Sequence, residues 1–166
     1  MAIWALGVML VTGAVLAADN KEKAAAVSEE DGKYFDADGN PTFKIENGTV
    51  DWYTFSGYRR YHSDCHVCHG PDGVGSSYAP PLIESMQSLD YGSFLSIVAE
   101  GRKNLGAGKE NVMPAFGDNK NVYCYLDDIY IYLRARAVGA APRGRPPRKA
   151  DKPEAAKAYE ASCMGG

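Results

Sequence analysis

Cys65-His66-Val67-Cys68-His69 places two cysteines three positions apart, with a histidine directly after the second. This C-x-x-C-H spacing is the attachment sequence of c-type haem. The two thiols add across the two vinyl groups of one haem edge, and the adjacent histidine then lies under the iron and coordinates it. The motif therefore predicts one covalently attached haem c, held by Cys65, Cys68 and His69.

Two other chemistries also use closely spaced cysteines. A structural zinc site needs two more ligands at compatible spacing, and Cys124 and Cys163 are not spaced as a second pair of this kind. A thioredoxin-like redox pair is expected next to a strand–helix–strand unit, which the sequence around the motif does not indicate. Both alternatives are weaker than haem attachment.

A second axial ligand must come from another part of the chain. His62 and His66 are too close to the attachment motif to reach the opposite haem face. Met113 stands in Met113-Pro114-Ala115-Phe116, far enough along the chain to cross over, and is the favoured ligand. Met86 is the alternative methionine, although it is more simply interpreted as a helix or core residue. A histidine and a methionine together raise the haem potential and fill both axial positions, which suits electron transfer.

Hydrophobic periodicity and turn residues predict a mostly α-helical chain. A small β hairpin is expected around Asp38-Gly39-Asn40-Pro41, with a second turn at Asn47-Gly48. The acidic residues near the first turn do not match a calcium-binding loop, because Pro41 stands where that loop needs glycine. Helices are expected at 51–64, 88–100 and 122–137, and loops at 70–82 and 101–119.

The first 18 residues carry no charged side chain, and the apolar run from Ile3 to Leu16 ends in a candidate cleavage segment, Val15-Leu16-Ala17. This pattern is typical of a signal peptide for export and predicts a periplasmic protein. The alternative is an uncleaved membrane anchor, since 18 residues are close to the minimum that can span a bilayer.

The residues around the motif resemble those of class I cytochromes c. Gly57-x3-Tyr61-x3-Cys65 is similar to the N-terminal helix pattern of that family, and His69-Gly70-Pro71-Asp72-Gly73-x-Gly75 is similar to its loop after the motif. The resemblance implies a class I cytochrome c fold. It also implies that the Pro80 carbonyl accepts the second N–H of His69, that Leu82 packs on the haem ring, and that the loop at Met113 covers the distal face.

A narrower resemblance covers residues 32–137. The segment from Val50 to His62 and the tyrosine-rich last helix look like the methanol metabolism-related periplasmic cytochromes, which accept electrons from methanol dehydrogenases that use pyrroloquinoline quinone (PQQ), particularly the lanthanide-dependent ones. The resemblance implies an electron carrier, not an enzyme. Its partners would be a PQQ alcohol or methanol dehydrogenase and a downstream cytochrome c or terminal oxidase. A general electron shuttle remains an alternative. A haem peroxidase is weaker, because no distal acid or base is apparent near Met113.

Four segments follow from these patterns: a signal peptide at 1–18, an acidic lead and β hairpin at 19–50, a cytochrome c domain at 51–137, and an extended Pro/Arg-rich tail at 138–166. Residues 1–133 carry 10 basic and 18 acidic side chains (net −8), and residues 134–166 carry 8 and 3 (net +5). The tail is either a docking arm for an acidic partner or a cover for the protein's own acidic surface. An exported acidic protein does not suit nucleic-acid binding.

Cys124 and Cys163 remain after the motif has used two of the four cysteines. In an oxidising compartment they are expected to form a disulfide. The alternative is a buried Cys124 and a loose Cys163.

Overall fold

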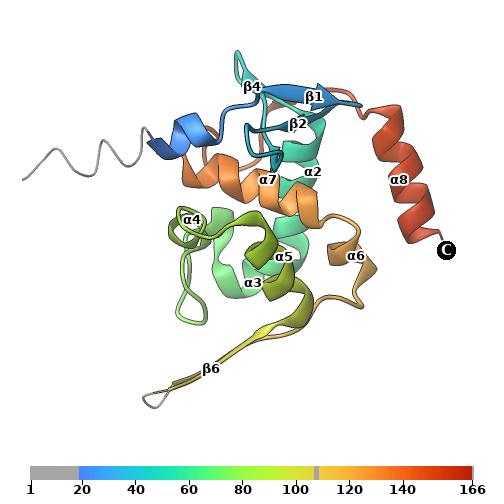
Figure 1. Ribbon diagram of the computed structural model, residues 1–166. Helices are drawn as coiled ribbons and strands as arrows, with labels where there is room; N and C mark the ends of the chain where they lie inside the picture. The colour runs from blue at the N-terminus through green and yellow to red at the C-terminus, as the bar shows by residue number, and fades with distance from the viewer. Residues whose placement is uncertain (1–18, 107–108, 166) are drawn as a thin grey trace, which may run out of the picture.

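A crossed pair of helices forms the centre of the molecule in the computed structural model, which describes residues 19–106 and 109–165 (Figure 1). The helices are α2 (Trp52–Arg60) and α7 (Leu126–Ala137). They meet at Gly57, where a β-carbon would lie only 1.8 Å from the backbone oxygen of Asp128. Glycine is required there because any side chain would push the two backbones apart. The predicted signal peptide lies outside the described residues.

The main core lies where α7 packs on α2, α4 (Leu82–Ser85) and α5 (Tyr91–Glu100). The apolar residues that recur at helical spacing in the last predicted helix are buried, namely Val122, Leu126, Ile129, Tyr130 and Leu133. Phe94 and Val98 of α5 are buried as well. The cluster consists of Tyr61, Met86, Phe94, Val98, Val122, Leu126, Ile129, Tyr130, Tyr132 and Leu133.

Two of the predicted helices are interrupted. The first ends as an α-helix at Arg60 and continues as a π-helical turn, η1 (Tyr61–Cys65), before α3 (His66–His69). The last divides at Tyr125, whose φ of −130° and ψ of 21° leave the helical region, into α6 (Lys120–Tyr123) and α7. The middle helix begins at Tyr91 because the side chain of Asp90 accepts a hydrogen bond from the Ser93 N–H at 2.8 Å.

Short antiparallel strands lie on one side of the helix pair. Strands β2 (Lys33–Phe35) and β3 (Pro41–Thr42) form the predicted hairpin, and β4 (Ile45–Glu46) and β5 (Thr49–Val50) flank the second predicted turn. No strand is predicted in the acidic lead before the hairpin. Instead, β1 (Ser28–Glu30) pairs with β2 and makes a three-stranded sheet.

The prediction of a loop at 101–119 is wrong. Strands β6 (Arg102–Gly106) and β7 (Lys109–Met113) pair in an antiparallel hairpin that extends away from the body (Figure 1). The polar and glycine-rich sequence of this segment has no apolar alternation to reveal a strand. The backbone pairing alone defines the hairpin.

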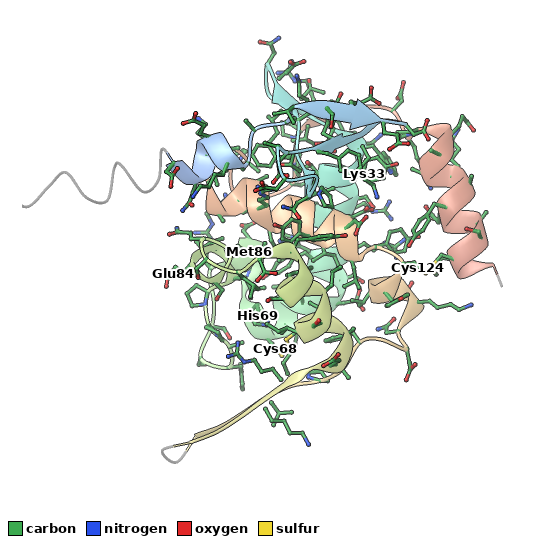
Figure 2. The ribbon with its side chains drawn as sticks, in the orientation of Figure 1. Lys33, Cys68, His69, Glu84, Met86 and Cys124 are labelled. Atoms are coloured by element: carbon green, nitrogen blue, oxygen red, sulfur yellow. A yellow bond between two sulfur atoms is a disulfide. The ribbon has the colours of Figure 1, made fainter. Side chains whose placement is uncertain are left out.

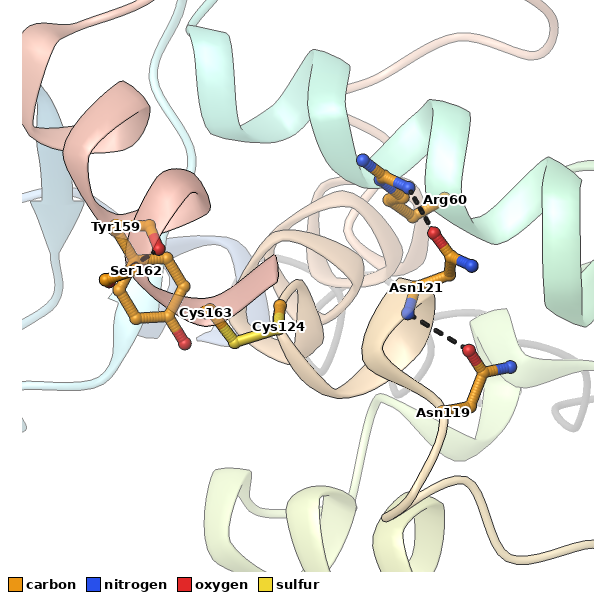
Figure 3. Close-up of a disulfide and its surroundings, with 7 residues drawn as sticks. All are labelled: Arg60, Asn119, Asn121, Cys124, Tyr159, Ser162 and Cys163. Atoms are coloured by element: carbon orange, nitrogen blue, oxygen red, sulfur yellow. Dashed lines mark hydrogen bonds between the residues drawn. A yellow bond between two sulfur atoms is a disulfide. The ribbon is translucent and has the colours of Figure 1, made fainter. Parts of the chain in front are cut away.

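The C-terminal segment is not extended throughout. Strand β8 (Arg148–Lys149) pairs in parallel with β5, and helix α8 (Glu154–Met164) follows. Cys124 and Cys163 are joined by a disulfide, with their Cα atoms 5.9 Å apart, so α8 is linked covalently to the end of α6 (Figure 3). The predicted pairing is confirmed. A short 3-10 turn, η2 (Pro71–Gly73), completes the elements.

No helix in the described ranges is long and apolar enough to cross a membrane.

Candidate haem-binding site

The attachment motif lies on one short stretch of helix. Cys65 ends the π-helical turn η1 and is partly buried, whereas Cys68 on α3 is exposed. Both are free thiols and are not bridged to each other. Cys68 and His69 are neighbours in the lower part of the molecule, where α3 lies (Figure 2). Because one thiol is exposed and the other is partly buried, a haem edge attached to both would lie at the boundary between core and solvent.

The ring of His69 is held in one orientation. Its Nδ1 lies 3.1 Å from the carbonyl oxygen of Pro80, and the residue is buried. Since a carbonyl oxygen can only accept a hydrogen bond, Nδ1 must carry the proton. The lone pair of a neutral ring is then on Nε2, which is the nitrogen available to a metal. This contact agrees with the hydrogen bond that the family resemblance implies for Pro80.

The backbone after His69 folds back on itself. The hydroxyl of Tyr61 donates to the carbonyl of Gly70 at 2.5 Å and faces the carbonyl of His69 at 3.2 Å. The N–H of Gly75 donates to the same His69 carbonyl at 2.8 Å. Gly70 has a φ of +71°, and a β-carbon there would lie 2.1 Å from the Gly75 oxygen. These bonds fix the position from which the His69 ring projects.

The surroundings of the cysteine pair bear on its alternative uses. The described residues contain no cluster of three or more His, Cys, Asp or Glu side chains that could hold a metal ion. Burial, with contributions from Asp64 and Cys68, raises the pKa of the Cys65 thiol to about 12. A dithiol redox site instead needs a thiol with a lowered pKa, because the thiolate is the nucleophile.

The two methionines differ in their surroundings. Met113 is the last residue of β7, is partly buried, and packs at the edge of the core cluster that Cys65 and Leu82 also contact. Met86 follows α4 and is fully part of the core (Figure 2). The segment after Met113 is tied to α5, since the N–H of Phe116 donates to the Val98 carbonyl at 3.0 Å. Cys65, Leu82 and Met113, which come from distant parts of the sequence, thus pack against the same core cluster.

The donor set suits a covalently bound haem. It offers two unbridged thiols at the attachment spacing, an imidazole with a defined free nitrogen, and a thioether at the end of strand β7. Imidazole and thioether are the axial ligands of electron-transfer haems. The roles of Tyr61 and Ser76 were not expected. The Tyr61 hydroxyl and the Ser76 hydroxyl, which donates to the Cys68 carbonyl, bind carbonyls that no sequence signal marks.

A separate cavity of about 240 Å³ lies between α7 and α8. It is lined by polar and aromatic side chains, among them Lys33, Tyr53, Asp128 and Tyr159, and by no residue of the attachment motif. The side chain of Lys33 already pairs with Asp127 at 2.8 Å in its wall. The cavity is therefore distinct from the candidate site.

Comparisons with known proteins agree with this site. Residues 55–133 match the family model described as cytochrome c oxidase, cbb3-type, subunit III. The chain is 55% identical to cytochrome c-553I of Paracoccus denitrificans over 138 residues, which cover 82% of this chain and 61% of that protein. It therefore spans about three-fifths of the length of that relative. It is 36% identical to cytochrome c-555 of Methylococcus capsulatus over 96 residues, covering 57% of this chain and 72% of that protein.

A solved structure is also similar. The crystal structure of the c-type cytochrome XoxG from Methylobacterium extorquens AM1 superimposes with a TM-score of 0.84 at 57% sequence identity. The match covers 88% of this chain and 90% of that one. The likeness therefore extends beyond the haem motif to the surrounding elements.

Proposed function

The chain belongs to the class I c-type cytochromes, electron carriers with covalently bound haem c, and from this premise we propose that it accepts electrons from a PQQ-dependent alcohol or methanol dehydrogenase in the periplasm. A downstream cytochrome c or a terminal oxidase then receives the electrons. The fixed orientation of His69, with Nε2 left for the iron, is the observation that carries the proposal.

The site residues divide into three roles. Cys65 and Cys68 would attach the haem, His69 and Met113 would ligate its iron, and Pro80 and Leu82 would support the His69 ring and the haem. When bound, haem c supplies an iron that changes between the ferric and ferrous states by one electron. Because two protein ligands hold the iron, the chain transfers electrons without binding a substrate there.

Electrons enter and leave at the haem edge that Cys65 and Cys68 bind, where the cofactor is nearest the surface. Val67, inside the motif, is 75% exposed, and Tyr78, on the following loop, is 76% exposed. No charged residue occurs between Asp72 and Glu84 or between Val112 and Gly117. An exposed, uncharged and partly apolar surface next to the cofactor suits a transient protein contact.

A PQQ dehydrogenase is proposed as the electron donor because of a sequence resemblance. The segment from Val50 to His62 and the tyrosine-rich α7 resemble the methanol metabolism-related cytochromes, as described above. The high identity to two cytochromes of known type over most of this chain supports a specific carrier rather than an unrelated haem protein.

Mixing the oxidised protein with a PQQ alcohol dehydrogenase and its alcohol tests the proposal. We expect the haem absorption to change to that of the ferrous form, faster than with an unrelated small c-type cytochrome at the same concentration. Omitting the alcohol should prevent the change. Reduction at the same rate as the unrelated cytochrome would leave a general electron shuttle as the function.

Charged substitutions locate the contact surface. Val67→Glu and Tyr78→Glu should each slow reduction by the dehydrogenase while leaving reduction by a small chemical reductant unchanged. Val27→Glu is the matched control, because Val27 is 64% exposed but precedes β1, outside the site. An equal effect of all three variants would rule out this surface.

A further inference from the structure

A buried carboxylate occupies the loop that follows the attachment motif. Asp72 lies in η2, and its side chain is almost completely enclosed. Oδ1 accepts hydrogen bonds from the Tyr132 hydroxyl at 3.1 Å and from the Gly144 N–H at 3.0 Å. Oδ2 faces Nε of Arg143 at 3.4 Å. Residues from α7 and from the C-terminal segment thus converge on one side chain three positions after His69.

His62 faces this carboxylate from the other side. Its Nδ1 lies 2.8 Å from the Tyr58 carbonyl, so Nδ1 must carry a proton. Its Nε2 lies 3.3 Å from the Asp72 backbone nitrogen and 3.4 Å from Asp72 Oδ1. In the neutral ring, Nε2 accepts from the Asp72 N–H. Adding a proton at Nε2 ends this acceptance, and Nε2–H then donates a charged hydrogen bond to Oδ1 of Asp72 instead.

The surroundings of the His62–Asp72 pair contain aromatic rings, a second imidazole and two arginines. The His66 ring on α3 lies 5.7 Å away, centre to centre, and the Tyr132 ring on α7 lies 6.0 Å away. Arg143 and Arg136 reach Asp72 rather than the His62 ring. The titratable or charged groups around the pair are Tyr58 (α2), Tyr61 (η1), His66 (α3), Asp72 (η2), Tyr132 and Arg136 (α7) and Arg143.

Asp72 is ionised and able to stabilise a proton on His62. Burial opposes its charge, but hydrogen bonds from Gly144, Tyr132 and Arg143 outweigh this effect and hold the pKa of Asp72 below its usual range. His62 is about four-fifths buried at the side chain, so screening by water is limited.

We propose that His62 and Asp72 form a proton-binding site coupled to the haem, at which His62 Nε2 takes up a proton when the iron is reduced. One electron converts the iron from ferric to ferrous, and one proton from solvent binds Nε2, with no bond broken. The inference rests on the haem attachment proposed above. The positive charge lost at the iron is thereby replaced, in part, by a positive charge at His62.

Linkage fixes the sign of the effect. Removing a positive charge from the iron favours protonation nearby, so the ferrous protein binds the proton more tightly. By reciprocity, protonation favours reduction by the same factor. The reduction potential should therefore be highest at low pH, fall as pH rises between the two titration midpoints of His62, and level off above them.

Spectroelectrochemical titration between pH 5 and pH 9 (about the range in which histidines titrate) tests the proposal. We expect the proton affinity of His62 in the two redox states to differ about fivefold. His62→Gln should remove this part of the pH dependence. His66→Gln is the matched control, because it removes a neighbouring imidazole that does not contact Asp72. Loss of the pH dependence in the His66 variant instead would overturn the proposal.

An NMR titration of His62 in the wild-type protein tests the proposal even if the His62 variant folds poorly. The NMR titration of the His62 ring in wild-type protein should have its midpoint at a higher pH in the ferrous than in the ferric form. Identical midpoints would refute the coupling. An unchanged haem absorption spectrum in each variant shows that haem attachment is intact. Reduction by the dehydrogenase is measured separately. A failure of the proton coupling is therefore distinguishable from a failure of the proposed function.

Discussion

The guanidinium of Arg134 lies 2.7 Å from Oδ2 of Asp36, which joins helix α7 to the turn of the N-terminal hairpin. Both side chains are largely buried, and the other oxygen of Asp36 accepts from the Asn40 N–H at 2.8 Å. Burial opposes the charge of Asp36, but Arg134 and Asn40 outweigh it and lower the pKa. The hairpin is therefore attached to the helical body by a charge that persists in mild acid.

Asp36→Asn should lower the free energy of unfolding by about 3 kcal/mol, because it leaves a buried guanidinium unpaired. The pKa of Asp36 is lower in the folded than in the unfolded state. Its stabilisation is thus present above the unfolded pKa and is lost as pH falls through the folded value. Urea unfolding at neutral pH and at about pH 3 should show the variant's deficit shrinking in acid. Asp38→Asn, at an exposed position of the same turn, is the control and should change little.

Gly57→Ala should destabilise the protein by about 3 kcal/mol or more, because the new methyl group would overlap the Asp128 backbone where α2 crosses α7. Gly92→Ala provides the comparison, since only the Asp90 side chain lies near that position in α5. It should raise stability by about 0.5 kcal/mol, because alanine favours a helix. Thermal unfolding measures both. Equal effects would contradict the close crossing.

Met113→Ala should remove the weak long-wavelength absorption that a thioether gives to ferric haem, and should lower the reduction potential. Met86→Ala should keep that absorption and instead cost about 3 kcal/mol of stability, because Met86 belongs to the packed core. Spectra and unfolding curves of both variants separate ligand from core residue. Loss of the absorption band in the Met86 variant would show that Met86, and not Met113, is the haem ligand.

Denatured, unreduced protein should expose no thiol to a labelling reagent, because Cys124 and Cys163 are bridged and haem occupies the other two. Cys163→Ser should cost on the order of 4 kcal/mol, as expected for a closed loop of this length. Ser162→Ala, next to it on α8, removes only a local hydrogen bond to Tyr159 and should have a small effect. Two labelled cysteines would show that the bridge does not form.

Neutralising Arg143, Arg145 and Arg148 together should lower thermal stability slightly and barely change the rate of reduction by the dehydrogenase. The structure favours the tail as a cover for the protein's own surface: Arg143 binds Asp72, Arg145 lies over the Phe55 ring, and Arg148 donates to the Asn47 carbonyl. Reduction rates measured at low and high salt test this expectation. A large loss of rate at low salt would favour a docking arm instead.

Local patterns in the sequence were enough to define the chemistry of the site and most helices. The attachment motif fits haem through spacing alone, since both thiols and the histidine lie within one turn of each other. The buried residues of α7 and the turn at Asn47-Gly48 also follow from local rules, because periodicity and backbone preference act over a few residues. The pairing of Cys124 with Cys163 followed from the predicted export signal and the number of cysteines.

Contacts between distant segments could be decided only by the tertiary structure. The convergence of Tyr132 and Gly144 on Asp72 joins residues 60 and 72 positions apart, and no local pattern records it. The β6–β7 hairpin was missed because its sequence has no apolar alternation, and α8 because a disulfide and a few contacts hold a weakly amphipathic segment. Packing between distant segments stabilises these contacts and elements, and such packing depends on the whole chain rather than on neighbouring residues.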